Sequence, residues 1–84
     1  MSTFDKIKSK ILSTPAANDL TAKEIQHFLE RYGFIQKRVN GSHFIYSHPS
    51  KNRNIMLNIP MHSPIKPTYI DHIRECILEI EGDE

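Results

Sequence analysis

Apolar residues recur at helical spacing in three separate segments of the chain. In each segment, positions three or four apart carry aliphatic or aromatic side chains, and the residues between them are mostly polar. This period predicts an amphipathic helix whose apolar stripe faces a core. The stripes consist of Phe4, Ile7, Ile11 and Leu12 in residues 3–13, of Ile25, Phe28, Leu29 and Tyr32 in residues 22–32, and of Ile70, Ile73, Ile77 and Ile80 near the end of the chain.

Local signals mark the ends of two of these helices. Thr21, with Glu24 three residues later, predicts a capping box at the start of the second helix. Gly33 is expected to end that helix in a left-handed conformation. At the last helix, Thr68 is the expected N-cap and Asp71 its acidic partner.

Between the second and the last helix, the pattern changes to alternation with a period of two. We expect strands at residues 34–39 and 42–47, joined by a hairpin turn at Asn40-Gly41, and a third strand that ends at Pro60. A polar loop over residues 48–54 would separate the second and third strands. The chain is therefore predicted to be α+β, in the order α-α-β-β-β-α. Helices would cover one face of a three-stranded antiparallel sheet, and the other face would stay free for a partner.

Length and composition narrow the class of protein. A chain of 84 residues favours a single domain. No apolar run approaches 18 residues, so no membrane-spanning segment is expected, and the first residues lack the apolar core of a signal peptide. Cys76 is the one cysteine, which excludes an internal disulfide and fits a reducing compartment. We expect a cytoplasmic location.

The charges are segregated along the chain, although the net charge is only +1. No Asp or Glu occurs between Arg31 and Ile70, and all ten acidic residues lie in the flanking segments. A cationic middle of this kind attracts polyanions and steers their approach. The alternative is a solvated face on which cations cluster by chance. The cationic residues of this stretch are Arg31, Lys37, Arg38, Lys51, Arg53 and Lys66.

Five histidines are many for a chain of this length. His27 and His72 point away from the apolar stripes of their helices, so both are expected to be solvated. His43, His48 and His62 fall within the acid-free stretch. Three histidines can hold zinc with one open position. Their spacing matches no common ligand pattern, however, and the surrounding cations would repel a divalent ion. We therefore expect neither a metal nor another cofactor.

His43 has the position that best suits catalysis. It follows Gly41, which lets the backbone approach a ligand, and Ser42, which adds a neutral hydrogen-bonding group, as Tyr46 does three residues later. A two-residue turn would place Arg38 opposite His43, where the guanidinium could hold a phosphate and favour the neutral imidazole. A three-residue loop would shift this register. The competing interpretation is a surface histidine in a hairpin.

Two short motifs carry a resemblance to a known family. The stretch from Arg38 to Tyr46 resembles the Gly-Ser-His-x-x-Tyr signature of HicA-type mRNA interferase toxins. The segment Ile59-Pro60-Met61-His62 resembles that family's second signature, Pro-x-His after the third strand. The step Lys66-Pro67-Thr68 into the last helix is similar as well, although Pro67 stands where the family usually has glycine. The likeness covers about residues 20–80, which would leave residues 1–19 as an N-terminal helical extension and residues 20–82 as a toxin-like core.

The resemblance implies a fold like that of the double-stranded-RNA-binding domain, α-β-β-β-α. It implies ribosome-independent cleavage of mRNA and a HicB-type antitoxin that covers the active site. The family's histidine corresponds to His43, its Gly-Ser and Tyr to Gly41, Ser42 and Tyr46, and its second histidine to His62.

Three functions remain in competition. The leading hypothesis is metal-independent cleavage of mRNA, with His43 as the base and Lys37 and Arg38 as candidates to stabilise the charge that develops on phosphorus. Lys66 and His62 would support binding of the RNA. The second is a non-catalytic RNA-binding module of the same fold. The third is a protein-interaction subunit without activity on RNA.

Overall fold

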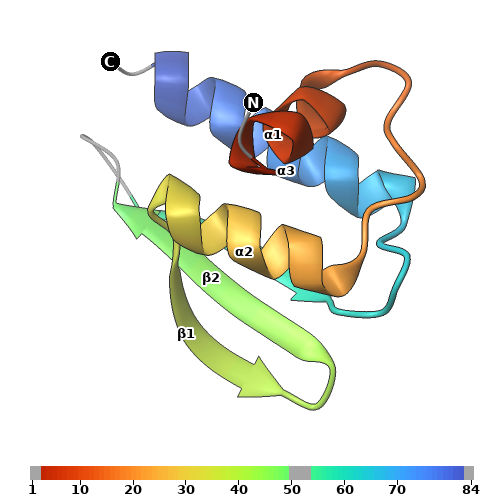
Figure 1. The fold of residues 1–84 in the computed structure, drawn as a ribbon. Coiled ribbons are helices and arrows are strands. Elements are labelled where there is room, and N and C mark those ends of the chain that lie inside the picture. The colour runs from red at the N-terminus through yellow and green to blue at the C-terminus, as the bar shows by residue number, and fades with distance from the viewer. Residues whose placement is uncertain (1–2, 50–53, 83–84) are drawn as a thin grey trace.

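The computed structural model describes residues 3–49 and 54–82. Its elements follow the expected order α-α-β-β-β-α, so the α+β prediction is confirmed (Figure 1). Within the described residues, no helix is both long enough and apolar enough to cross a membrane. The elements are α1 (Thr3–Leu12), α2 (Ala22–Tyr32), β1 (Ile35–Asn40), β2 (His43–Pro49), β3 (Asn54–Pro60) and α3 (Pro67–Gly82).

The ends of α2 form as the sequence predicts. The Thr21 hydroxyl accepts a hydrogen bond from the Glu24 backbone N–H at 3.1 Å, and the Glu24 carboxylate accepts one from the Thr21 N–H at 2.9 Å. Gly33 has a φ of 115°, in the left-handed region where glycine is favoured. The Phe34 N–H then donates to the Leu29 carbonyl at 2.9 Å, which directs the chain into β1.

The first turn of α3 differs from the prediction. The helix begins at Pro67, so Thr68 lies inside the first turn and is not its N-cap. Proline suits the first helical position, because its fixed φ is helical and the N–H that it lacks would have had no partner there. The carbonyl of Lys66 accepts the N–H groups of Tyr69 and Ile70 at 2.9 and 3.2 Å, which places Lys66 directly before the helix.

The three strands form an antiparallel sheet in the order β1-β2-β3. The hairpin between β1 and β2 has two turn residues, but these are Gly41 and Ser42 and not the predicted Asn40-Gly41. Asn40 pairs with His43, and Arg38 pairs with Ile45. The pairing of Arg38 with His43, one of the registers that the sequence leaves open, therefore does not form. A bulge between Gln36 and Arg38 shifts the register once more along β1.

The second and third strands are longer than the alternation predicts. His48 pairs with Ile55 and Pro49 with Asn54, so strand pairing takes up both ends of the predicted polar loop. Ladder hydrogen bonds satisfy the backbone even where the side chains are polar, which is why the pattern misplaced these ends. The central part of that loop, with Lys51 and Arg53, lies outside the described residues.

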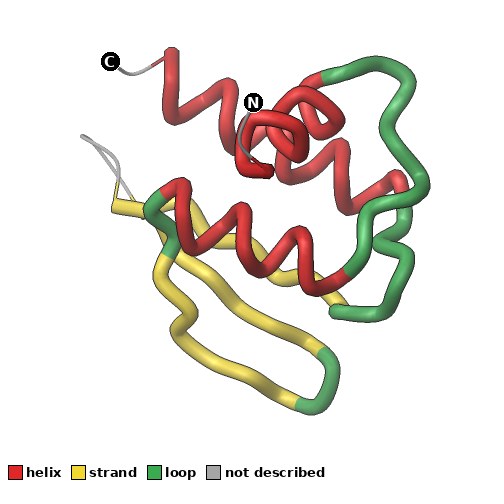
Figure 2. Tube along the Cα trace, viewed as in Figure 1, coloured by secondary structure: helices red, strands yellow, loops and turns green. Residues whose placement is uncertain are grey.

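Helices cover one face of the sheet and leave the other uncovered (Figures 1 and 2). The covered face carries the buried side chains of Tyr46, Leu57 and Ile59, which pack beneath α2 and α3. Successive strand residues alternate between faces, so the residues between these point the other way. We call that side the outer face; it includes Ile35, Arg38, Asn40, His43, Ile45, Ser47, Met56 and Asn58, of which Ser47 is buried.

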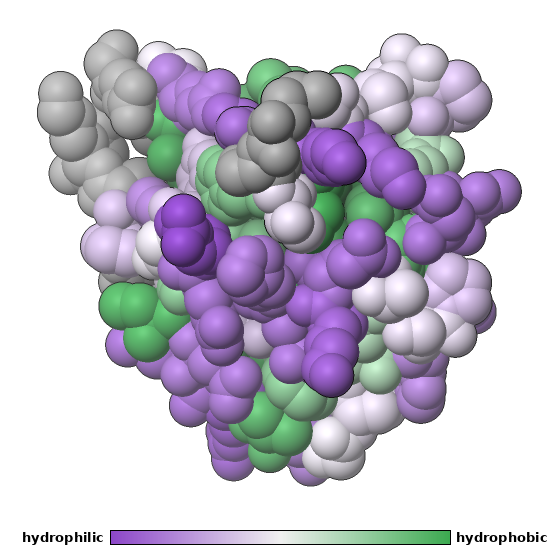
Figure 3. Space-filling model, viewed as in Figure 1, coloured by the Kyte–Doolittle hydropathy of each residue, from purple (hydrophilic) through white to green (hydrophobic). Residues whose placement is uncertain are grey.

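The hairpin extends past the helices that cover the rest of the sheet (Figure 1). All six residues of β1 are exposed, including Val39, which keeps 46% of its surface accessible. Figure 3 shows hydrophilic side chains over most of the helical side, with a hydrophobic group at the lower end, where the hairpin lies. β1 is therefore an edge strand whose residues are available to a partner.

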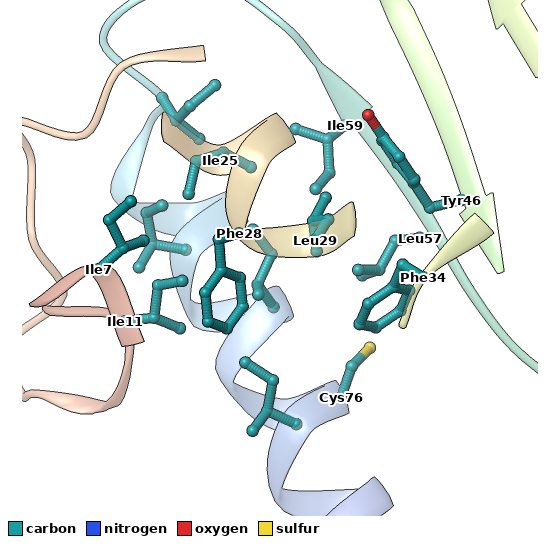
Figure 4. Close-up of a cluster of buried hydrophobic side chains, with 14 of the residues drawn as sticks. Ile7, Ile11, Ile25, Phe28, Leu29, Phe34, Tyr46, Leu57, Ile59 and Cys76 are labelled. Carbon is teal, nitrogen blue, oxygen red and sulfur yellow. The ribbon is translucent and has the colours of Figure 1, made fainter. Parts of the chain in front are cut away.

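The N-terminal helix α1 packs on α2 and α3, on the side away from the sheet (Figure 1). Ile7 and Ile11 are fully buried and point toward Phe28 (Figure 4). The Phe4 ring stacks on that of Phe28, with centroids 5.0 Å apart. At the rim, Lys8 pairs with Glu81 at 2.9 Å. The extension thus closes the hydrophobic core above the two helices.

Candidate active site

An open pocket lies where the start of β2 meets the loop between β3 and α3. Its volume is about 250 Å³. Two histidines, one lysine and one tyrosine face it together with two prolines, so its walls combine cationic, titratable and aromatic groups. We call it the histidine pocket; it is lined by His43, Pro60, His62, Pro64, Lys66 and Tyr69.

His43 is the first residue of β2 and belongs to the outer face. The hairpin turn places it there, because Gly41 takes a φ of 62° that a side chain would disfavour. A positive φ at the first turn residue alone matches a type II′ hairpin turn. The His43 Nδ1 lies 3.4 Å from the side-chain oxygen Oδ1 of Asn58, on the neighbouring strand β3. The imidazole is otherwise exposed toward solvent.

The loop over residues 61–66 is fixed by hydrogen bonds to distant parts of the chain. The Met61 N–H donates to the Ser42 carbonyl at 2.7 Å, which ties the loop to the hairpin turn. Ser63 Oγ accepts from the Ala22 N–H at 2.8 Å, and the Ile65 N–H donates to the Leu20 carbonyl at 2.8 Å.

These contacts hold alternate residues of the loop against the rest of the molecule. The side chains between them, those of His62, Pro64 and Lys66, are exposed and face the pocket. The loop therefore presents its two cationic or titratable groups from a fixed backbone.

Several predicted site residues come together around this pocket. His43, His62 and Lys66 line it directly, although His62 and Lys66 lie 19 and 23 positions after His43 in the chain. Gly41 and Ser42 form the adjoining turn, and the Ser42 carbonyl holds the loop. The structure thus joins the two short motifs at one place.

Two predicted cationic residues lie outside the pocket. Lys37 sits at the bulge of β1, and Arg38 pairs with Ile45. Arg38 and His43 nevertheless share the outer face as diagonal neighbours, a separation of about 7–8 Å between strands that an arginine side chain can bridge. Arg38 is available to a long ligand that crosses the sheet, and it does not stand directly beside the imidazole.

Tyr46 is not part of the pocket, which corrects its expected place as a polar group near His43. It lies three positions along the same strand, and an odd spacing puts it on the opposite face. Its side chain is fully buried, and its hydroxyl has no hydrogen-bond partner among the described residues (Figure 4). Burial raises the pKa of this phenol, and the charge of Glu30 raises it further. Tyr46 is therefore a residue of the hydrophobic core.

The three histidines of the acid-free stretch do not converge. His48 lies on the covered face, where its ring meets the edge of Phe34 at a centroid distance of 5.0 Å. Within the described part of the chain, no three His, Cys, Asp or Glu side chains are arranged to hold a metal ion. His27 and His72 are exposed on their helices, as predicted, and Cys76 is buried as a core residue.

The sequence did not single out Asn58 or Tyr69. Alternation along β3 does place Asn58 on the face opposite to Leu57 and Ile59, but only the register with β2 brings it next to His43. Tyr69 lies in the first turn of α3, half-buried, and its position at the pocket depends on the path of the preceding loop. The place of both residues at the site therefore depends on contacts between elements that are distant in sequence.

Comparison with known proteins adds the identity of the family. No curated protein and no solved structure matches the chain significantly. A family model described as the HicA toxin of bacterial toxin–antitoxin systems matches residues 22–78. The match spans α2, the whole sheet and most of α3, and it includes every residue of the histidine pocket. With more than half of its length matched, the chain belongs to the HicA family of bacterial toxins.

Proposed function

We propose that the protein is a metal-independent endoribonuclease that cleaves mRNA at the histidine pocket. One observation carries this proposal: His43, His62 and Lys66 line the same pocket on the matched core. Cleavage of RNA by its own 2′-hydroxyl requires proton transfer and stabilisation of negative charge, and imidazole and ammonium groups supply both.

His43 acts as the general base. When its Nδ1–H points to Asn58 Oδ1, the lone pair of Nε2 is free to take a proton. Nε2 removes the proton of a ribose 2′-hydroxyl, and the 2′-oxygen attacks the adjacent phosphorus. The bond from phosphorus to the 5′-oxygen breaks, and this oxygen takes up a proton, leaving a 2′,3′-cyclic phosphate and a 5′-hydroxyl end.

Lys66 supplies positive charge for the pentacovalent transition state. It is the one lysine that lines the pocket, and its neighbour Pro67 begins α3, which fixes its backbone. Arg38, farther along the outer face, and Lys37, at the bulge of β1, would bind phosphates upstream or downstream of the cleaved bond. General-base catalysis alone contributes roughly 10²–10⁴-fold, so the turnover should be slow.

Cleavage of labelled RNA in EDTA tests the proposal. The wild-type protein should cut RNA and leave DNA of the same sequence intact, because DNA lacks the nucleophile. The His43→Ala variant should lose about 10²–10⁴-fold in rate, whereas His72→Ala, which changes an exposed histidine on α3, should keep the wild-type rate. Intact RNA together with salt-sensitive binding would instead favour a non-catalytic RNA-binding module.

The partner that we infer is a HicB-type antitoxin bound over the histidine pocket. The outer face supports this, because helices leave it uncovered and Met56 exposes 54% of its surface there. Such an antitoxin should stop RNA cleavage when it is added to the purified toxin. A complex that still cuts RNA at the free-toxin rate would place the antitoxin elsewhere.

A further inference from the structure

We propose that His62 is the second catalytic residue, the general acid that protonates the leaving 5′-oxygen. This inference rests on the proposed function and names a partner for His43 in the same reaction. Base catalysis by His43 creates an alkoxide that attacks phosphorus, but the departing 5′-oxygen also carries negative charge. A protonated group on the other side of the scissile bond removes that charge.

Backbone contacts keep His62 close to His43. Pro60 pairs directly with His43 across β2 and β3. The His62 N–H donates to the Pro60 carbonyl at 3.0 Å, a tight turn that folds the chain back at the end of the strand. The neighbouring Met61 N–H donates to Ser42, the residue before His43. The two histidines are thus held by the same end of the sheet.

The pocket offers three groups with an acidic proton besides His43. A phosphodiester fits well within its volume of about 250 Å³, so the groups that line the pocket can reach the same phosphate. Among His62, Lys66 and Tyr69, imidazole is the side chain whose proton gain and loss both occur near neutral pH. An ammonium or phenol group gives up its proton far less readily. His62 is therefore the acid, and Lys66 remains a fixed charge.

Asn58 separates the roles of the two histidines. Its Oδ1 lies 3.4 Å from Nδ1 of His43 and selects the tautomer with the proton on Nδ1, which leaves the Nε2 lone pair free, as a base requires. His62 has no such acceptor among the described residues and is exposed on its loop, where solvent can return the proton that it gives to the leaving oxygen. In each turnover His43 gains one proton and His62 loses one, and solvent restores both.

An RNA with a sulfur in place of the 5′-bridging oxygen at the cleaved bond tests this assignment. The wild-type protein is first used to map a cleavage site, and the sulfur is then placed at that site. A thiolate leaves without a proton, so this substrate has no need of a general acid. His62→Ala should cut the ordinary RNA about 10²–10⁴-fold more slowly than wild type, yet cut the sulfur-containing RNA at nearly the wild-type rate. His43→Ala should be slow on both.

Other outcomes would overturn the assignment in distinguishable ways. A His62→Ala variant equally slow on both substrates, or unimpaired on ordinary RNA, would show that His62 is no acid while leaving the ribonuclease activity in place. Rescue of His43→Ala by sulfur would reverse the two roles. Absence of any RNA cleavage by the wild type would overturn the proposed function itself. His62→Gln repeats the test with a polar side chain, and circular dichroism of each variant confirms that it is folded.

Discussion

Replacing Ile11 by alanine measures how far the first helix contributes to the core. Ile11 lies in α1, outside the part of the chain matched by the family, and none of its surface is exposed. The substitution removes three carbon atoms between α1 and the helices beneath it. If α1 were only a loosely attached extension, the loss of these atoms would hardly change the free energy of unfolding.

The magnitude follows from burial. Truncation of a fully buried isoleucine to alanine costs about 2–5 kcal/mol, from lost transfer free energy and the cavity left behind. The higher helix propensity of alanine offsets this cost by a few tenths of a kcal/mol. A loss of about 1 kcal/mol lowers Tm by roughly 4–8 °C in a domain of this size, so Ile11→Ala should melt at least about 7 °C below wild type.

Leu78→Ala is the matched control for thermal unfolding followed by circular dichroism. It also removes three carbon atoms from a helix, but 55% of Leu78 is exposed on α3. A surface change of this kind stays within about 0.5 kcal/mol of wild type. Equal melting temperatures for the two variants would refute the assignment of α1 to the core.

Four further substitutions, at three positions, probe the two faces of the sheet and the rim of the helices. Tyr46→Phe should raise the free energy of unfolding by about 1 kcal/mol in urea denaturation, because it removes a buried hydroxyl without a partner, and it should leave RNA cleavage unchanged. Slower cleavage would mean that Tyr46 also serves the pocket. Asn58→Ala should slow cleavage by releasing the His43 ring, whereas Asn58→Asp should restore the acceptor and, by favouring the imidazolium, move the acidic limb of the pH–rate profile to higher pH. Unchanged profiles in both variants would remove Asn58 from the mechanism. The Lys8 ammonium holds the pKa of Glu81 below its ordinary 4.5, so this pair stabilises the fold above that pH and the contribution is lost as pH falls through the lowered pKa. Glu81→Gln should therefore cost about 0.2–1 kcal/mol at neutral pH and little in strong acid; an equal cost at both would rule out the charge as its source.

Local patterns predicted most of the elements. The capping box of Thr21 and the glycine at position 33 define α2 because each acts within one turn of helix. The apolar stripes and the alternation along β3 likewise depend on neighbours in sequence. The family signatures then predicted His43 and His62 as site residues, and the structure places both in one pocket.

The register of the hairpin could not be read from the same patterns. Asn40-Gly41 is the commonest signal for a turn with positive φ at both central residues. Here Gly41 is the first central residue, and among the described residues only glycines have a positive φ. Either turn satisfies the sequence, and the pairing of Asn40 with His43 shows which of the two forms. The bulge in β1 then changes the partners again.

The pocket depends on contacts between distant segments. Its loop is held by Leu20, Ala22 and Ser42, which no local pattern connects with residues 61–66. For the same reason the sequence does not predict Asn58 or Tyr69 as site residues, since each lies at the site through a neighbour on another element. The sequence thus predicts several chemical groups of the candidate site, and tertiary pairing decides which of them meet.

The two faces of β2 make a genetic selection informative. His43 and Tyr46 belong to one short motif, yet one faces solvent and the other the core. In a library that covers every position of β2 and selects cells surviving toxin expression, both positions would yield survivors. Survivors altered at His43 would contain full amounts of intact toxin, whereas those with a polar residue at Tyr46 would contain little, because proteases remove the unfolded chain. Toxin abundance in the survivors, compared between His43 and Tyr46, would show inside living cells which of the two side chains the fold depends on.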